Sequence, residues 1–136
     1  MAQILDGKVV AAKVQTAVAE GVGSLRARGV EPTLAVVLVG EDPASKVYVG
    51  GKRRACQAVG IAARDHLFPQ GLSEGDLLSL IRELNADRSV HGILVQLPLP
   101  SGVDEDRMIA AVDPAKDVDG FHPENLGRLL AGMPGV

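Results

Sequence analysis

A tyrosine and a lysine four positions apart, Tyr48 and Lys52, are the side chains of this sequence whose types and spacing best suit acid/base chemistry. Residues four apart on a helix project from the same face, one turn above the other. A lysine at the margin of a buried face keeps its stem packed while its amine meets a ligand, and a nearby partner then sets its proton affinity. The pair predicts a ligand site in a cleft; a solvated lysine beside a tyrosine at the core edge is the ordinary alternative.

Two further polar segments follow apolar runs. Gln96 ends one such run and precedes two prolines, so its amide is either an ordinary exposed group or a hydrogen-bond partner for Lys52 or a ligand. The segment 117–120, Asp-Val-Asp-Gly, is either a structural turn or a carboxylate site for two N–H groups of a heterocycle, such as an amino-pyrimidine edge. The oxygen ligands that a calcium loop needs do not follow it.

Other chemistries are disfavoured by spacing. The three histidines, His66, His91 and His122, are far apart and show no paired helical spacing, so no metal site is expected. Tyr-x-x-x-Lys also occurs in short-chain dehydrogenases, which need a glycine-rich dinucleotide turn well upstream. The first 40 residues contain no such turn, because Gly21 and Gly23 lie inside a helical pattern.

Composition narrows the fold class and the partners. A chain of 136 residues predicts one domain, and 46% hydrophobic with 2% aromatic residues predicts a core of Val, Leu, Ile and Ala, which suits a parallel sheet covered by helices. The net charge of −3 and the lack of a basic run argue against nucleic acid as a partner. No segment has signal-peptide or membrane-span length, so we expect no membrane partner. Cys56 is the only cysteine, which suits a packing residue in a reducing cytoplasm.

Hydrophobic periodicity predicts alternating helices and strands. Asp42 or Ser45 is expected to cap the helix that carries Lys52, with Val47, Gly51, Ala55 and Val59 as its apolar face. Strand, helix, strand, helix, strand, helix is an α/β fold of three layers, with a mostly parallel open sheet flanked by helices. The expected helices are 6–28, 45–60, 73–84, 104–112 and 123–130, and the expected strands are 34–39, 63–68 and 90–95.

This order of elements predicts where a ligand binds. In open α/β sheets ligands lie outside the carboxyl ends of the strands. The front of the Lys52 helix, Gln96 and the 117–120 turn all follow strands or lie near their ends, so we expect them to converge on one cleft.

Four blocks in order closely resemble the bifunctional methylenetetrahydrofolate dehydrogenase/methenyltetrahydrofolate cyclohydrolase family. They span essentially the whole chain and comprise Ile4-Leu5-Asp6-Gly7-Lys8, Val39-Gly40 with Ser45-x-x-Tyr48-Val49-x-x-Lys52, Gly92 to Pro100, and Lys116-Asp117-Val118-Asp119-Gly120-Phe121. The resemblance implies an enzyme of one-carbon metabolism, linked to purine biosynthesis. It would oxidise 5,10-methylenetetrahydrofolate with NADP and hydrolyse the methenyl product to 10-formyltetrahydrofolate.

The resemblance also implies roles for individual residues. Lys52 would be the key catalytic residue, held by Gln96, with Tyr48 along the folate ring system. The substrate-binding set would be Tyr48, Lys52, Val95, Gln96, Leu97 and Asp119, with Asp119 anchoring the pterin edge. A lysine suits hydrolysis of a cationic methenyl carbon better than an arginine, because it can become neutral and exchange protons.

The resemblance further implies a division into domains. Residues 1–131 would form the folate-binding catalytic domain, and 132–136 would begin a linker to an NADP-binding Rossmann domain that this chain lacks. The isolated chain would then lack dehydrogenase activity, because nothing holds the hydride acceptor. The parent enzyme would be a homodimer without a metal, and this chain alone a monomer. Two alternatives stay open: a pterin-binding module without catalysis, and the N-terminal domain of another two-domain dehydrogenase.

Overall fold

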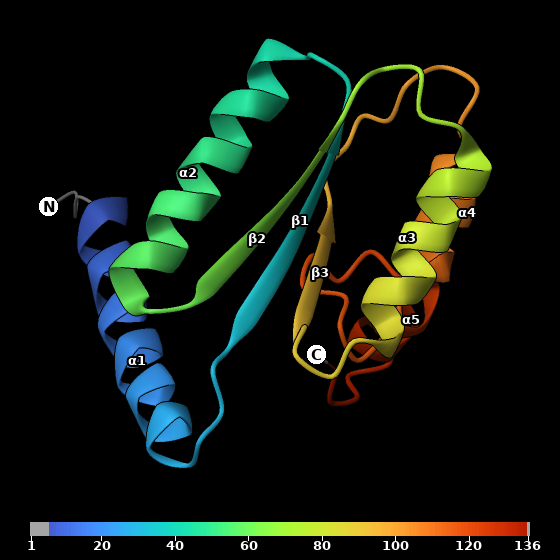
Figure 1. The fold of residues 1–136 in the computed structure, drawn as a ribbon. Coiled ribbons are helices and arrows are strands. Elements are labelled where there is room, and N and C mark those ends of the chain that lie inside the picture. The colour runs from blue at the N-terminus through green and yellow to red at the C-terminus, as the bar shows by residue number, and fades with distance from the viewer. Residues whose placement is uncertain (1–5, 136) are drawn as a thin grey trace, which may run out of the picture.

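Three parallel strands form the centre of the molecule, in the order β2-β1-β3 (Figure 1). The structure is a computed structural model that describes residues 6–135. The strands are β1 (Thr33–Val39), β2 (Ala62–Phe68) and β3 (Gly92–Val95). Both β2 and β3 run parallel to β1. In the register, Thr33 of β1 pairs with Ala62 of β2, and Leu34 of β1 pairs with Gly92 of β3. The predicted parallel sheet is therefore confirmed.

The middle strand β1 is buried on both faces, as its unbroken apolar run predicts. Its alternate residues belong to two separate cores. Val36 and Leu38 pack with Val49 of α2 (Pro43–Val59) on one face. On the other face the larger core comprises Ala35, Val37, Val39, Leu77, Ile81, Leu84, Val90, Ile93, Val95, Leu99, Met108 and Val112.

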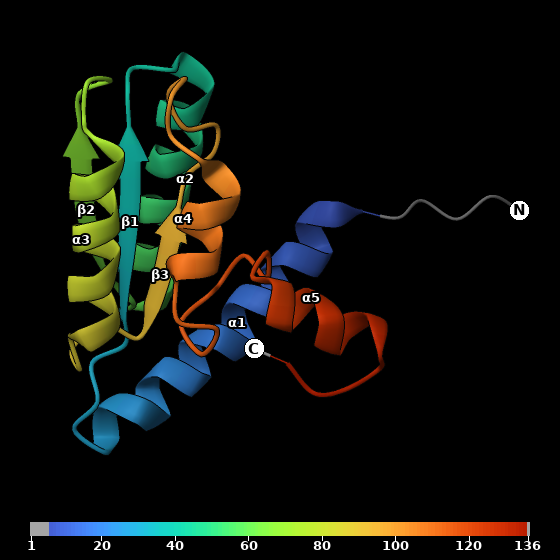
Figure 2. The same ribbon diagram turned by 90° about the vertical axis from the view of Figure 1, so that its right-hand side faces the viewer.

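Helices cover both faces of the sheet, which gives the predicted three layers. In Figure 1, α1 (Gly7–Ala27) and α2 lie on one side of the sheet, and α3 (Glu74–Ala86) and α4 (Glu105–Ala111) lie on the other. The last helix, α5 (Pro123–Leu130), extends away from the sheet beyond β3 (Figure 2). None of the helices in the described range 6–135 is long and apolar enough to cross a membrane.

Side-chain caps set where the helices begin. Asp42 accepts a hydrogen bond from the backbone N–H of Ser45 at 2.7 Å, which starts α2, and Pro43 occupies its first turn. Gly60, with φ of +85°, ends α2 in the left-handed conformation that favours glycine. Ser73 caps α3 in the same manner, as its sequence predicts.

The predicted apolar face of α2 is wrong at Val47 and Ala55 and confirmed at Val59. Val47 is 71% exposed and Ala55 is exposed, whereas the buried positions are Ser45, Val49, Cys56 and Val59. The helix faces the strands through this row, in which Val49 packs with Val36 and Leu38. Lys52 lies three residues after Val49 and four before Cys56, so it sits within the docked row rather than beside it.

The apolar side chains of α1 do not form a buried face. Among the described residues of α1 only Val22 is buried, while Val10, Val14 and Val18 are exposed. The helix packs along α2 instead of against the sheet. Two residues of the first sequence block, Ile4 and Leu5, lie outside the described residues.

Candidate functional site

The amine of Lys52 lies between an amide and a carboxylate from two other parts of the chain. Its Nζ is 3.4 Å from Oε1 of Gln96 and 3.9 Å from Oδ1 of Asp119. The side chains of Lys52 and Asp119 are 34% and 33% exposed, so the three groups form a half-buried cluster open to solvent. This convergence is the one that the sequence predicts for the carboxyl ends of the strands.

Gln96 reaches Lys52 because of the alternation along β3. Ile93 and Val95 point into the core beneath α3, so Leu94 and Gln96 point toward α2. The backbone N–H of Gln96 donates to the carbonyl of Val37 at 2.9 Å, which extends the pairing with β1 by one residue. Its Nε2 donates to the carbonyl of Leu97 at 2.8 Å, and this bond directs Oε1 toward the lysine.

Asp119 reaches the same place because its segment runs beside β3. Asp117 forms a parallel bridge with Ile93, and the N–H of Ile93 donates to the carbonyl of Lys116 at 2.7 Å. A chain that runs parallel to β3 advances by about 3.3 Å per residue. Asp119 follows two residues after the bridge, and its Oδ1 lies 3.9 Å from the Nζ of Lys52 that Gln96 also contacts.

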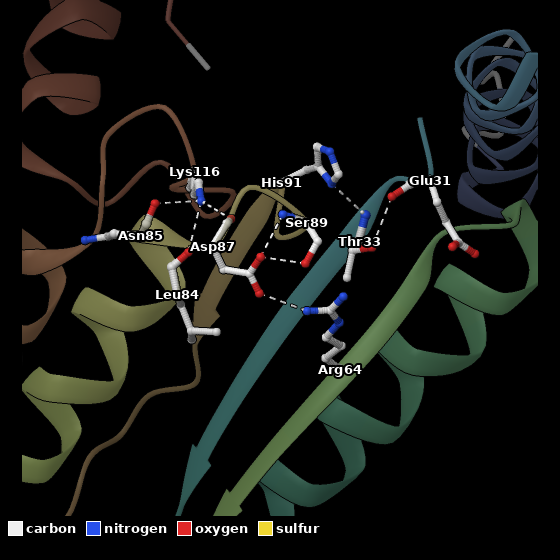
Figure 3. A network of polar contacts seen from close by, with 9 residues as sticks. All are labelled: Glu31, Thr33, Arg64, Leu84, Asn85, Asp87, Ser89, His91 and Lys116. Carbon is white, nitrogen blue, oxygen red and sulfur yellow. Dashed lines mark hydrogen bonds and ion pairs between the residues drawn. The ribbon is translucent and has the colours of Figure 1, made fainter. Parts of the chain in front are cut away.

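The start of this segment is anchored at the opposite, amino end of the sheet. The Nζ of Lys116 donates to the carbonyls of Leu84, Asn85 and Asp87, at 2.9, 2.8 and 2.8 Å (Figure 3). These carbonyls end α3, where a cation is favoured by the helix dipole. The lysine thus ties the segment that leads to Asp119 to the end of α3.

Three other predicted residues lie near the cluster in different ways. Tyr48 precedes Lys52 by one turn of α2 and is 64% exposed. The side chain of Val95 is buried in the core beneath α3. Leu97 is half-buried, and its carbonyl accepts from both Gln96 and the hydroxyl of Ser45, the latter at 3.5 Å.

Ser45 is a site residue whose place the sequence reasoning did not recognise. It is buried, and its hydroxyl contacts the loop that carries Gln96. Its spacing of seven residues before Lys52 puts both on one face of α2, which was the available indication.

Cys56 lies one turn after Lys52 and is unsuited to nucleophilic chemistry. Burial raises the pKa of its thiol, and the nearby carboxylate of Asp65 raises this pKa further. A thiol with a raised pKa supplies little thiolate. The predicted packing role of Cys56 is consistent with this environment.

Acidic side chains stand at the starts of α2, α3 and α4. A pyrophosphate binds at a free, positively polarised helix N-terminus. The first turn after β1 instead contains Glu41 and Asp42, and the Asp42 carboxylate already occupies the N–H of Ser45. The starts of α3 and α4 also carry acidic side chains. Within residues 6–135, no cluster of three or more His, Cys, Asp or Glu side chains could hold a metal.

A parallel α/β sheet with a lysine, an amide and a carboxylate at its carboxyl edge has the arrangement that is typical of domains that bind small molecules. The family model for the tetrahydrofolate dehydrogenase/cyclohydrolase catalytic domain matches residues 5–119. The chain belongs to this family, which confirms the resemblance seen in the four blocks.

Individual relatives agree with this assignment. The bifunctional protein FolD of Geotalea uraniireducens is 54% identical over 134 residues, which cover 98% of this chain and 48% of the relative. The bifunctional FolD structure from Campylobacter jejuni matches with a TM-score of 0.94 and 44% identity, over 96% of this chain and 46% of that one. The Trypanosoma brucei FolD structure, complexed with NADP and an inhibitor, matches with a TM-score of 0.88 and 33% identity, over 94% and 44%. The chain spans about half the length of the curated relatives that it matches.

Proposed function

We propose that this chain provides the folate site and the acid/base lysine of a bifunctional enzyme. This enzyme oxidises 5,10-methylenetetrahydrofolate with NADP and hydrolyses the methenyl product. The observation that carries the proposal is the cluster of Lys52, Gln96 and Asp119 at the carboxyl edge of the sheet. Family membership supports the choice of folate as the substrate class.

The hydrolytic step assigns a role to each group. Water adds to the cationic methenyl carbon, and the amine of Lys52 is the group placed to accept the proton that the water loses. The protonated amine then gives its proton to the leaving nitrogen as the ring C–N bond breaks, while the adduct hydroxyl releases its proton to solvent and becomes the formyl carbonyl of 10-formyltetrahydrofolate. The Gln96 amide holds the amine in place, because its oxygen accepts from Nζ while its own N–H is held by Leu97.

Asp119 is proposed to bind the pterin edge through its two carboxylate oxygens. A carboxylate suits a heterocycle that presents two adjacent N–H donors. The 3.9 Å separation between Asp119 and Lys52 exceeds a direct hydrogen bond, so Oδ1 is available to another donor. Tyr48 lies one turn along α2, where an exposed ring offers a stacking surface for the folate ring system.

NADP is proposed to bind outside these residues, on a second unit of Rossmann type that follows a linker beginning near residue 132. The acidic helix starts of this chain support that division, as does the greater length of its relatives. We accordingly propose that this chain alone lacks dehydrogenase activity. A homodimeric parent enzyme in the cytoplasm, acting in one-carbon metabolism that supplies purine biosynthesis, completes the proposal.

The deciding experiment follows the decay of 5,10-methenyltetrahydrofolate absorbance, which needs no nicotinamide. The chain is compared with buffer, with Lys52→Met and with Lys46→Met, which removes an exposed lysine of the same helix. We expect acceleration that Lys52→Met abolishes and Lys46→Met retains, with circular dichroism showing that both variants are folded. Folate binding with equal hydrolysis by Lys52→Met and the unsubstituted chain would indicate a non-catalytic pterin module. No folate binding at all would favour another two-domain dehydrogenase.

A further inference from the structure

Asp117 is a buried carboxylate two residues before the proposed pterin anchor. It is 6% exposed, and Asn125 on α5, which contacts it, is 7% exposed. Buried polar side chains persist where hydrogen bonds satisfy them. Their partners therefore reveal what these two residues hold together.

The carboxylate of Asp117 closes the backbone around Asp119. Its Oδ1 accepts from the N–H of Gly120 at 3.1 Å, and its Oδ2 accepts from the N–H of His122 at 2.9 Å. Both donors follow Asp119 in the chain, so the two bonds fold residues 117–122 into a tight turn with Asp119 at its outer side. Gly120 has φ of +71°, a left-handed conformation that this turn requires.

Asn125 joins the turn to the rest of the fold. Its Nδ2 donates to Oδ2 of Asp117 at 2.9 Å and to the carbonyl of Pro114 at 2.9 Å. It therefore links the start of α5 both to the turn and to the chain just before it. The turn is held at both ends, because the bridge from Asp117 to Ile93 attaches it to β3.

We propose that Asp117, supported by Asn125, is a positioning residue of the folate site. It holds the turn that presents Asp119 to Lys52 and to the pterin edge. The part of this inference that concerns folate binding rests on the proposed function. The part that concerns the placement of Asp119 beside Lys52 does not, because that placement is a property of the chain without ligand.

The number of hydrogen-bond donors around position 117 explains why an aspartate, and not an asparagine, is suited to this place. Three N–H groups converge on two oxygens, and a carboxylate accepts all of them. Asparagine has nearly the same size but only one acceptor oxygen, so its NH₂ group would face donors at one end. Asp117→Asn therefore breaks the turn without changing the packing volume, since buried N–H groups lose their acceptors.

The first experiment detects the placement of Asp119 without any ligand. The ¹³Cγ resonance of the Asp119 carboxylate is recorded with and without Lys52→Met. In the otherwise unsubstituted chain we expect Lys52→Met to move this resonance, because the amine lies 3.9 Å away. In the Asp117→Asn background the same substitution is expected to leave the resonance unmoved. An equal displacement in both backgrounds would overturn the proposal.

The second experiment is a double-mutant cycle on tetrahydrofolate affinity. Asp119→Asn and Asp117→Asn are each expected to weaken binding by roughly tenfold or more, the loss of one charge-assisted contact. If Asp117 acts through Asp119, the double variant binds within about twofold of Asp119→Asn alone. Losses that simply multiply would contradict a positioning role. Asp104→Ala, which removes the cap of α4 and no hydrogen bond of the turn, should lower Tm and leave affinity unchanged.

A second route covers the outcome in which Asp117→Asn does not fold. Asn125→Ala removes one of the three donors and leaves the carboxylate in place. It is expected to reduce the Lys52-dependent displacement of the Asp119 resonance and to weaken tetrahydrofolate binding in the same direction. A folded Asn125→Ala protein with an undiminished resonance displacement would overturn the proposal. If the unsubstituted chain binds no tetrahydrofolate, the folate assignment fails, and the resonance measurement still decides the role of Asp117.

Discussion

Lys52 and Gln96, which are 44 positions apart, meet with Nζ 3.4 Å from Oε1, while Nε2 of Gln96 is held at 2.8 Å by the carbonyl of Leu97. The glutamine amide is therefore oriented from both ends. A neutral acceptor in this position steadies the amine without adding charge. Glutamate has the same length as glutamine but would place a negative charge beside the amine, so the two side chains are expected to act differently here.

Gln96→Glu is expected to slow hydrolysis of 5,10-methenyltetrahydrofolate by at least roughly tenfold in kcat. A carboxylate at position 96 would hold Nζ in a second ion pair, in addition to the one with Asp119 at 3.9 Å, and would keep it from the reacting water. The same negative charge attracts the cationic substrate, so KM should not rise. Steady-state kinetics of Gln96→Glu and Gln96→Ala test this effect. Equal kcat for the two variants would show that the added charge has no influence.

Gly92→Ala should displace the segment that carries Asp119. A Cβ at this position would lie 2.6 Å from Cγ1 of Val118 and 3.3 Å from Cδ1 of Leu34. Overpacking of this kind costs about 1–3 kcal/mol in the free energy of unfolding, measured in urea. Adding Val118→Ala removes the contact and should restore most of the loss. A stable Gly92→Ala protein would contradict the close packing.

Gly23→Ala is the matched control for that measurement. No atom lies within 4 Å of a Cβ added at Gly23, which is inside α1. The substitution should raise the free energy of unfolding by about 0.5–1 kcal/mol, because alanine favours the helix. Gly23→Ala and Gly92→Ala thus add the same methyl group and are expected to change the free energy of unfolding in opposite directions.

Acid should weaken the start of α2 through Asp42. Its hydrogen bonds with Ser45, from the backbone N–H first, hold the pKa of this carboxyl below its ordinary range. A lowered folded-state pKa means that the ionised form stabilises the fold above the ordinary pKa of about 4. This contribution is lost as the pH falls through the lower, folded-state value. Urea unfolding from neutral pH to below pH 4 should show a smaller acid-induced loss for Asp42→Asn. Parallel losses in the two proteins would contradict the assignment.

Cys56 should resist alkylation while the chain is folded. Burial of the thiol and the nearby Asp65 carboxylate both raise its pKa, so thiolate forms only above the usual thiol range. Mass spectrometry after iodoacetamide treatment at neutral pH should show slow labelling in buffer and rapid labelling in urea. Rapid labelling of the folded chain would show a reactive thiol and would overturn the packing role.

The sequence by itself determined the α/β order and the end of the sheet where chemistry gathers. The short, β-branched apolar run of β1 predicted a strand buried on both faces, and parallel strands bring their carboxyl ends to one edge. Lys52, Gln96 and Asp119 follow from that connectivity and from the family blocks. The order of helices and strands along the chain could be predicted because the periodicity of each segment is a local property of the sequence.

Only the tertiary structure decided which face of each helix is buried. Val47 and Val49 are equally apolar, yet α2 buries Val49 and exposes Val47, because docking depends on the shape of the strands beneath it. The roles of Asp117 and Asn125 were likewise invisible in the sequence. The three hydrogen-bond donors to the Asp117 carboxylate, one of them Asn125, are brought together by a turn. A buried carboxylate is recognised only when its surroundings are known.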